Sequence, residues 1–471
     1  MGLSWSGADI EPPARRSWAA RPVGPSGLLE PLPIDSARLI VVTAATRGNR
    51  RRRQGSGSLT GAFRSALASA LVSSLSMDER ATTMAAMRAA LEQELPAAVE
   101  LRRRVHAQPE LSGAERRTAE AVTDAIGVGE VSVVAETGRL IRIGRPDGPC
   151  IAVRAELDAL PLIECTGSDD ASTNGLMHAC GHDVHLAAVA ALARAAARVE
   201  LPVPLLVILQ PREEKPPSGA REIVATKILT EHEARAVVGA HVQPLLARHT
   251  VAATEGAVNA STDEFEVLIT GRGGHGGYPH LTRDPVLALA QVIVALQQVV
   301  SRRIDPLHAA VLSIGAVRAG SAANVIPDEA HAHGTLRLLD VADREAVHEE
   351  ITTIVDRVAA GFGCRGEVRI QDGEPALVND PVLAAGAHPW LDELGFEIAP
   401  SLRSCGADDF SHYGDVARIL MMFVGVDQQP GLTEPAILHH PTFRPTDVAV
   451  RDVALALLAG YVAALDASIV G

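Results

Sequence analysis

Five side chains that can bind metals crowd one short segment of the chain, residues 178–185, which reads HACGHDVH. Imidazole and thiolate groups are preferred ligands of zinc and of its neighbours among the transition metals. Cys180 and His182 lie two residues apart, so they can face one ion only from an irregular turn before a helix. A Cys-x-His pair alone is weak evidence, because a histidine near a helix start is more often a cap or a core residue.

Three further segments carry ligand-type side chains directly after apolar runs that we predict to be strands. Glu213 and Glu214 follow the run within residues 201–211, and His241 belongs to the end of the run AVVGAHV. His439 and His440 lie in ILHHPTF, after another apolar segment. In open parallel sheets, ligands bind beyond the carboxyl ends of the strands. Together the four segments predict a metal site, although an exposed helix N-terminus would also favour the two glutamates.

Alternating strands and helices must position these side chains. A helix is predicted for MAAMRAALEQELPAAVELRRRVHAQPEL, interrupted at Pro96 and ended by Pro109, and a short β-branched run begins at Cys150. A second helix, from Gly219 to Glu231, precedes the strand AVVGAHV. Strands that alternate with helices indicate an α/β layer sandwich with a largely parallel sheet.

The pattern changes after Ala260. TDEFEVLITG alternates apolar and polar residues, which is typical of a strand with one solvated face. The helix that follows has Asp284 as its N-cap and a proline at its first position. We therefore predict an inserted α+β domain over residues 261–373, within a catalytic domain made of residues 83–260 and 374–471.

Residues 1–82 are predicted to be a disordered basic leader. Residues 1–76 hold ten arginines and four acidic residues, with RGNRRRRQGSGS at their centre and no lasting periodicity. A solvated tail is favoured over a nucleic-acid or targeting tag. The stretch GAFRSALASALVSSLSM is similar to an export signal but is interrupted by Arg64, and Met77 or Met84 is an alternative translation start.

Composition narrows the functional classes. The net charge of −14 disfavours nucleic acid as a partner, and no apolar run reaches the roughly 18 residues of a membrane-spanning helix. Five scattered cysteines do not form a disulfide framework, which predicts a cytoplasmic protein. The motif GRGGHGG matches the dinucleotide fingerprint in form, but Pro279 follows it and no helix opens within it, so a dinucleotide enzyme is excluded.

Nine blocks of sequence resemble, in order and over about residues 84–471, the M20 peptidase/amidohydrolase family. They are most similar to its N-acyl-amino-acid amidohydrolases, the group with hippurate hydrolases and auxin-conjugate hydrolases. The blocks are LRRRVHAQPELSGAE, VRAELDALPLIE, GLMHACGHDVHLAA, QPREE, VVGAHVQP, ITGRGGHGGYPH, SAANVIPDEAHAHGTLRLL, GADDFSHY and LHHPTF. The resemblance implies a three-layer α/β metallopeptidase catalytic domain with an inserted α+β lid, which is also a dimerisation domain.

The resemblance also implies the site residues. Two divalent ions (zinc, manganese or cobalt) would be held by Cys180, His182, Glu214, His241 and His439. Glu213 would be the catalytic acid/base, which takes a proton from the attacking water and delivers it to the leaving amine. A thiolate suits a bridging position because metal binding deprotonates it.

Further roles follow from the same resemblance. His275 would stabilise the tetrahedral oxyanion in the partner subunit's site, Asn324 would assist it, and Arg337 would bind the substrate carboxylate. Asp158 would orient a metal-bound histidine. Without the resemblance, Arg337 would be read as an exposed strand residue.

Several neighbouring residues have weaker assignments. We expect structural roles for the other three potential ligands of the first segment, His178, Asp183 and His185. Asp408 stands where relatives usually have glutamate, and Arg212 stands beside the base where they have alanine.

The leading function is hydrolysis of the amide bond of an N-acyl- or N-aroyl-amino acid by a homodimeric, metal-dependent enzyme. One alternative is a dipeptidase or carboxypeptidase with the same site. An alternative of another class is a non-catalytic metal-binding scaffold, which the chemically competent residue at every ligand position and at Glu213 disfavours.

Overall fold

The computed structural model describes residues 75–427 and 436–466, all of them within the compact unit Leu59–Gly471. The predicted disordered basic leader, residues 1–82, and its export-like segment lie mostly on residues 1–74, outside the described residues.

The first described helix, α2 (Met77–Ala107), corrects two predictions. It begins at Met77 rather than at Met84, so residues 77–82 are helical and not part of a disordered leader, because Ser76 and Glu79 form a capping box at its N-terminus. It also continues through Pro96, with buried Leu91 and Leu101 on either side of the proline in one hydrophobic core. Packing on both sides outweighs the poor helix propensity of a single proline.

One eight-stranded sheet forms the centre of the α/β part of the chain, in the order β1-β2-β4-β3-β5-β16-β6-β15. The central strands β4, β3, β5 and β16 are mutually parallel, and antiparallel pairs occur only toward the two edges. The prediction of a largely parallel sheet is confirmed. The strands are β1 (Glu130–Val134), β2 (Gly138–Ile143), β3 (Cys150–Glu156), β4 (Leu205–Gln210), β5 (Ala234–Gln243), β6 (Thr250–Ala252), β15 (Glu397–Ile398) and β16 (Arg418–Gly425).

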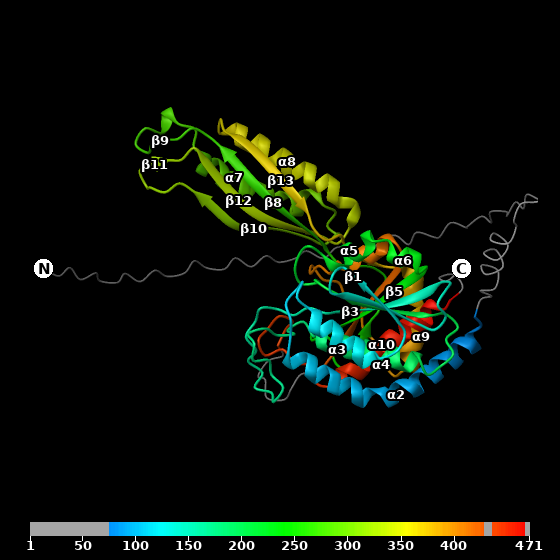
Figure 1. The fold of residues 1–471 in the computed structure, drawn as a ribbon. Helices are drawn as coiled ribbons and strands as arrows, with labels where there is room; N and C mark the ends of the chain where they lie inside the picture. The colour runs from blue at the N-terminus through cyan, green and yellow to red at the C-terminus, as the bar shows by residue number, and fades with distance from the viewer. Residues whose placement is uncertain (1–74, 428–435, 467–471) are drawn as a thin grey trace, which may run out of the picture. The chain divides into compact units, whose positions relative to one another are not determined.

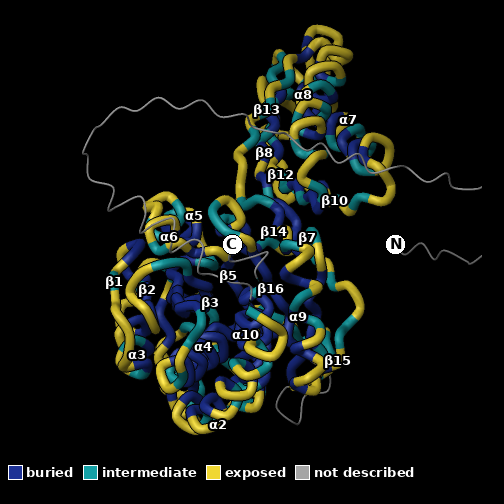
Figure 2. Tube along the Cα trace, turned by 90° about the vertical axis from the view of Figure 1, so that its right-hand side faces the viewer, coloured by how far each residue is buried: buried dark blue, intermediate teal, exposed yellow. Residues whose placement is uncertain are grey.

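Helices cover both faces of this sheet, which gives the predicted three layers (Figure 1). The helices on one face share a large apolar core with the strands, and burial is concentrated in the central strands and in α4 and α10 (Figure 2). The helices of that face are α2, α3 (Arg116–Ile126), α4 (His182–Ala196), α9 (Pro381–Glu393) and α10 (Val448–Ala464). The opposite face carries α5 (Gly219–Ala225), α6 (Ile228–Glu231) and the 3-10 helix η4 (Asp409–Asp415).

The helix predicted from Gly219 to Glu231 is therefore two short helices. Lys227 separates α5 from α6 and has a positive φ of 63°, a conformation that interrupts a helix.

A four-stranded antiparallel sheet, ordered β10-β12-β8-β13, forms the core of the α+β part of the chain between Ser261 and Asp372. Strand β8 alternates buried and exposed positions, as predicted for a strand with one solvated face. Two helices cover its other face and share its core. The elements are β8 (Ser261–Thr270), β10 (Ala310–Ala319), β12 (Glu329–Leu338), β13 (Arg365–Asp372), α7 (Pro285–Gln298) and α8 (Arg344–Gly361).

Helix α7 begins as predicted, with the Asp284 carboxylate accepting hydrogen bonds from the backbone N–H groups of Val286 and Leu287. With the π-helical turn η2 (Val299–Arg303) it forms a span, Pro285–Arg303, that is long and apolar enough to cross a membrane by length and composition. The expectation that no such run exists is wrong. Ala288, Leu289, Val292 and Leu296 of α7 pack into the core under the antiparallel sheet, whereas Val286, Leu287 and Val294 are exposed.

Short elements complete the described residues. Two small antiparallel pairs and two 3-10 turns connect the larger elements: β7 (Gly256–Asn259) with β14 (Leu377–Asn379), β9 (Gly274–His275) with β11 (Val325–Ile326), η1 (Pro279–Leu281) and η3 (Val341–Asp343). No helix opens inside the glycine motif that precedes η1, in line with the exclusion of a dinucleotide fingerprint.

Candidate metal centre

The candidate ligands gather at one edge of the large sheet. Glu213 and Glu214 follow β4, and His241 lies near the end of β5. Because β4, β3 and β5 are parallel, their carboxyl ends lie at the same edge. His182 is the first residue of α4, Gly181 is its N-cap, and Cys180 lies one residue before that cap.

The side chains of these segments meet. The Cys180 Sγ lies 3.4 Å from His241 Nε2, and His439 Nε2 lies 3.4 Å from Glu214 Oε1. His182 Nε2 lies 4.0 Å from the same Glu214 oxygen. One ligand atom from each of Cys180, Glu214 and His439 falls within 4.8 Å of the other two. The structure thus brings together all five residues for which the sequence predicted metal binding.

Two of the imidazoles are fixed in the tautomer that a metal ligand needs. The Nδ1–H of His182 donates to the backbone carbonyl of Asp158 at 2.8 Å, and that of His241 donates to the carbonyl of Val242 at 2.7 Å. In the neutral ring, the form that binds a metal, each Nε2 then has its lone pair facing the cluster. Burial lowers the pKa of His241 to about 3, so this imidazole is neutral and able to bind a cation.

Unsatisfied polar atoms mark the same point. Among the described residues, His182 Nε2 and Glu214 Oε1 are buried and have no hydrogen-bond partner. Buried polar atoms are hydrogen-bonded in the great majority of cases. Two buried acceptors that face one point without a partner therefore indicate a cation-binding site. The residues present fit a metal centre.

Electrostatic effects shift the pKa values of the two adjacent glutamates in opposite directions. Burial, together with the charges of Glu214 and Asp408, raises the pKa of Glu213 well above its usual range. Burial also disfavours the charged form of Glu214, but His439 and His182 outweigh it and hold its pKa below the usual value. Two neighbouring carboxylates with opposite shifts can take different roles, one as a proton acceptor and donor and the other as an anionic ligand.

The thiol of Cys180 lies in the same negative field. Burial raises its pKa well above the usual range, and the nearby charges of Glu214 and Glu213 raise it further. A bound cation would reverse this balance, because metal coordination deprotonates a thiol.

Asp158 acts through a different contact from the one predicted. Its carboxylate accepts hydrogen bonds from Ser112 Oγ at 2.7 Å and from the backbone N–H of Glu214 at 2.9 Å. The group that orients His182 is the backbone carbonyl of Asp158, whereas its carboxylate oxygen lies 3.8 Å from the ring nitrogen. Asp158 therefore fixes two candidate ligands, one by its backbone and one by its side chain.

The three remaining candidates of the first segment lie behind the cluster. His185 accepts a hydrogen bond from the Val242 N–H at 3.0 Å and donates to Glu156 at 2.9 Å, which occupies both ring nitrogens. Asp183 binds Arg102 and His106. The ring nitrogens of His178 are buried and have no hydrogen-bond partner among the described residues.

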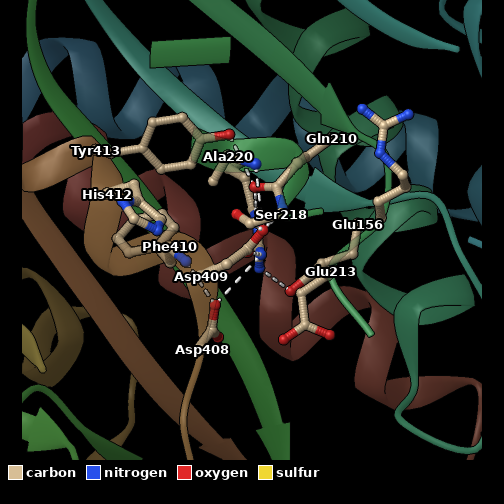
Figure 3. A network of polar contacts seen from close by, with 12 residues as sticks. Glu156, Gln210, Glu213, Ser218, Ala220, Asp408, Asp409, Phe410, His412 and Tyr413 are labelled. Carbon is tan, nitrogen blue, oxygen red and sulfur yellow. Dashed lines mark hydrogen bonds and ion pairs between the residues drawn. The ribbon is translucent and has the colours of Figure 1, made fainter. Parts of the chain in front are cut away.

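Sequence reasoning missed a buried network beside the cluster, part of which is drawn in Figure 3. Arg154, on β3, forms ion pairs with Glu156, with Asp408 at 3.3 Å and with Asp409 at 2.9 Å. The sequence did contain a signal for this network: an arginine and a glutamate lie inside the buried run CIAVRAE. Because such charges are almost never fully buried without partners, they indicate buried ion pairs.

Arg212 is turned away from the base that it adjoins. Its guanidinium donates to the Pro217 carbonyl at 3.2 Å and binds Glu222 on α5. Its backbone has a positive φ of 51°, and its N–H donates to Glu115 at 3.0 Å. Its contacts are with the protein, so it anchors its own loop.

A cleft of about 740 Å³ opens beside the glutamates. The Arg337 side chain lines it half-buried, and no ion pair or hydrogen bond involves this guanidinium within the described part of the chain. Thr262, Glu264, Thr335, Cys405, Asp408 and His439 line the same cleft. An unpaired arginine next to the candidate metal centre suits an anionic group of a ligand.

His275 and Asn324 are not brought to this cleft. Arg337 pairs with Thr262 at the beginning of β8, whereas His275 follows the other end of that strand. Ten residues of strand span roughly 30 Å. His275 and Asn324 do lie together, since the Gly276 N–H donates to the Asn324 carbonyl at 2.8 Å.

A sheet edge with imidazoles, a thiol and paired carboxylates around one point is the arrangement of a metal-dependent hydrolase. Residues 152–460 match the model of peptidase family M20/M25/M40. The N-acetylcysteine deacetylase of Bacillus subtilis is 36% identical over 73% of this chain and 90% of its own length. The N-acetyldiaminopimelate deacetylase of Bacillus cytotoxicus is 30% identical over 77% of this chain and 96% of its own length.

Solved structures agree with these sequence matches. A dinuclear metal-binding peptidase of the M20 family from Bacillus subtilis has a TM-score of 0.69 and 31% identity, over 79% of this chain and 99% of its own. A tripeptidase from Staphylococcus aureus, at 17% identity and a TM-score of 0.60, shares the fold alone. This chain belongs to peptidase family M20/M25/M40. The predicted family and enzyme class, an amidohydrolase that acts on C–N bonds, are confirmed.

Proposed function

We propose that this protein hydrolyses the amide bond of N-acyl- or N-aroyl-amino acids with two divalent metal ions. The observation that carries the proposal is the convergence of Cys180, His182, Glu214, His241 and His439 on one point, with Glu213 beside them. The named relatives support the substrate class, because two are deacetylases of N-acetylated amino acids.

The five convergent residues would hold the ions. Zinc, manganese and cobalt all suit this mixture of sulfur, nitrogen and oxygen ligands. When bound, the ions supply Lewis acidity, which activates a water molecule and polarises the amide carbonyl. Cys180 is the candidate shared ligand, because it lies against His241 on one side and groups with Glu214 and His439 on the other.

Glu213 is the proton carrier of this proposal. Its carboxylate lies 3.8 Å from His182 Nε2, next to the ligand cluster and at the cleft. Its raised pKa suits a group that must accept a proton from water and then release it to the leaving amine nitrogen. Glu214 keeps the lowered pKa of a ligand.

Arg337 would bind the substrate carboxylate with its guanidinium fork. His275 and Asn324 would complete the site of a partner subunit, since they lie at the end of β8 away from Arg337. The enzyme would then be a homodimer through the lid, and each site would use residues of both chains. We also propose a cytoplasmic location, in keeping with five cysteines that are all free thiols.

Subunit complementation tests the shared site. His275→Ala and Glu213→Gln are each expected to be nearly inactive. Random reassociation of an equal mixture gives half heterodimers, each with one intact site, so about a quarter of wild-type activity should return. No recovery in mixed dimers would show that His275 serves its own chain or has no catalytic role.

The direct test of the function is metal analysis with a substrate screen. Glu213→Gln should keep the wild-type metal content and lose about 10²- to 10⁴-fold in kcat on the best acyl-amino acid. The exposed Glu120→Gln on α3 is the control and should match wild type. A dipeptide with a free amine, cleaved faster than its N-acylated counterpart, would favour a peptidase instead. Full turnover by Glu213→Gln would remove Glu213 from its role.

A further inference from the structure

The buried carboxylate of Asp409, at the start of η4, binds donors from three other elements (Figure 3). Its Oδ1 accepts from Gln210 Nε2 at 2.7 Å and from Arg154 at 2.9 Å. Its Oδ2 accepts from Ser218 Oγ at 2.8 Å and from the backbone N–H of Ala220 at 3.2 Å. Only 2% of the Asp409 surface is exposed, so water does not compete for these bonds.

The donors flank the segment that carries the paired glutamates. Gln210 is the last residue of β4, and Ser218 is the N-cap of α5. Residues 211–217 lie between them and include Glu213 and Glu214. A single carboxylate, from a part of the chain about 190–200 residues away, therefore holds both ends of this loop.

The Gln210 amide is oriented without ambiguity. Its Oε1 accepts hydrogen bonds from the Tyr413 hydroxyl and from Arg154 Nε, both at 2.8 Å. The amide nitrogen must then point at Asp409. The hydrogen bonds of these four charged or polar groups are compatible with a single arrangement. A fully satisfied buried network of this kind keeps its side chains in a fixed geometry.

The two ends of the loop 211–217 are also in close contact with each other. The Gly219 N–H donates to the Arg212 carbonyl at 3.1 Å, and the Arg212 guanidinium donates to the Pro217 carbonyl. A Cβ placed on Gly219 would lie 1.7 Å from the Pro211 carbonyl oxygen, so the two ends are in direct contact. A small movement of either end of the loop would therefore displace Glu213 and Glu214.

We propose that Asp409 is a positioning residue that holds the ends of the loop 211–217 together and so aims Glu213 and Glu214 at the metal cluster. The role of Glu213 in this inference rests on the proposed function. Asp409 itself lies behind the loop: one of its carboxylate oxygens falls within 4.8 Å of one from Glu213, without a hydrogen bond between the two. Its hydrogen bonds act through the loop, and its charge also contributes to the raised pKa of Glu213.

Asp409→Asn tests this role with a side chain of the same size. Whichever way the amide is turned, it cannot accept from all four donors, because one of its ends is itself a donor. We expect kcat to fall about 100-fold at saturating metal while KM changes less than threefold, since displacing a catalytic group by about 1 Å costs that much. In the metal-free protein, backbone amides of residues 211–220 should exchange with deuterium at least tenfold faster than in wild type.

Asp452→Asn is the matched control. Asp452 is also a buried carboxylate that binds an arginine, Arg248, but it lies on α10. This variant should lose stability without changing kcat per folded molecule or the exchange of the loop. Ser218→Ala gives a milder second test: it should lower kcat several-fold, because it removes one of the four donors to Asp409.

The inference is overturned if Asp409→Asn matches Asp452→Asn in kcat per folded molecule, or if its loop amides exchange as in wild type. If Asp409→Asn does not fold, an unchanged kcat in Ser218→Ala overturns it. Failure of the proposed function would look different, since Glu213→Gln would then retain turnover whatever the exchange of the loop.

Discussion

Gly219→Ala probes the alignment of the glutamates through a single methyl group. The Cβ of the new alanine would lie 1.7 Å from the Pro211 carbonyl oxygen, and both atoms are tied to backbone. Real Cβ–oxygen contacts rarely fall below about 3 Å, so the two ends of the loop must separate by more than 1 Å. Glu213 and Glu214 lie between these ends and must shift with them.

We expect a loss of about 100-fold in kcat, because an error of about 1 Å in a reacting group costs that much. Stability should fall by about 1–3 kcal/mol from overpacking, which still leaves a folded protein. Steady-state kinetics at saturating metal, with a urea titration to measure the folded fraction, provides the assay.

Gly361→Ala supplies the control for the same chemical change. No heavy atom lies within 4 Å of a Cβ placed on Gly361, at the end of α8, so this variant should retain wild-type kcat. A Gly219→Ala protein that is folded and turns over at the wild-type rate would refute the argument that the closed loop aligns the glutamates.

Three further results are expected. Arg337→Lys should raise KM about tenfold or more with little change in kcat. Steady-state kinetics should show no such effect with a substrate whose carboxylate is replaced by a carboxamide. Burial would raise the pKa of Asp263, but hydrogen bonds from Arg344 and His348 hold it below its usual value. Asp263→Asn should therefore cost about 3 kcal/mol at neutral pH. This difference in urea unfolding should shrink as the pH falls below about 4, where Asp263 of the unfolded chain binds a proton, and should be lost as the pH falls through the lowered pKa of native Asp263; a pH-independent difference would contradict the ion pair. A chelator should lower the melting temperature, and added zinc at about 100 times its Kd should restore about 2.7 kcal/mol; a melting temperature insensitive to both would argue against a metal centre.

The segments that carry the candidate ligands were predictable from local patterns, whereas the particular set of five residues followed from the family resemblance. Glu213, Glu214 and His241 each follow or end a short apolar run, and parallel strands bring such positions to one edge. Asp284 with Pro285 likewise predicted the start of α7, since capping depends on a few adjacent residues.

Other features depend on contacts that no local pattern contains. Asp409 reaches Ser218 across 191 residues, and its role is invisible until the fold brings them together. Helix α2 continues through Pro96 because of tertiary packing, which propensity alone does not include. Asp158 was predicted to orient a histidine with its carboxylate. In the structure its backbone carbonyl orients His182, whereas its carboxylate accepts a hydrogen bond from the Glu214 N–H.

Anomalous X-ray scattering from crystals of the metal-reconstituted enzyme tests the central claim most directly. We predict two peaks about 3.5–4 Å apart, with Cys180, His182, Glu214, His241 and His439 each about 2.0–2.6 Å from at least one of them. A single peak, or two peaks that these five side chains do not reach, would contradict the di-metal centre.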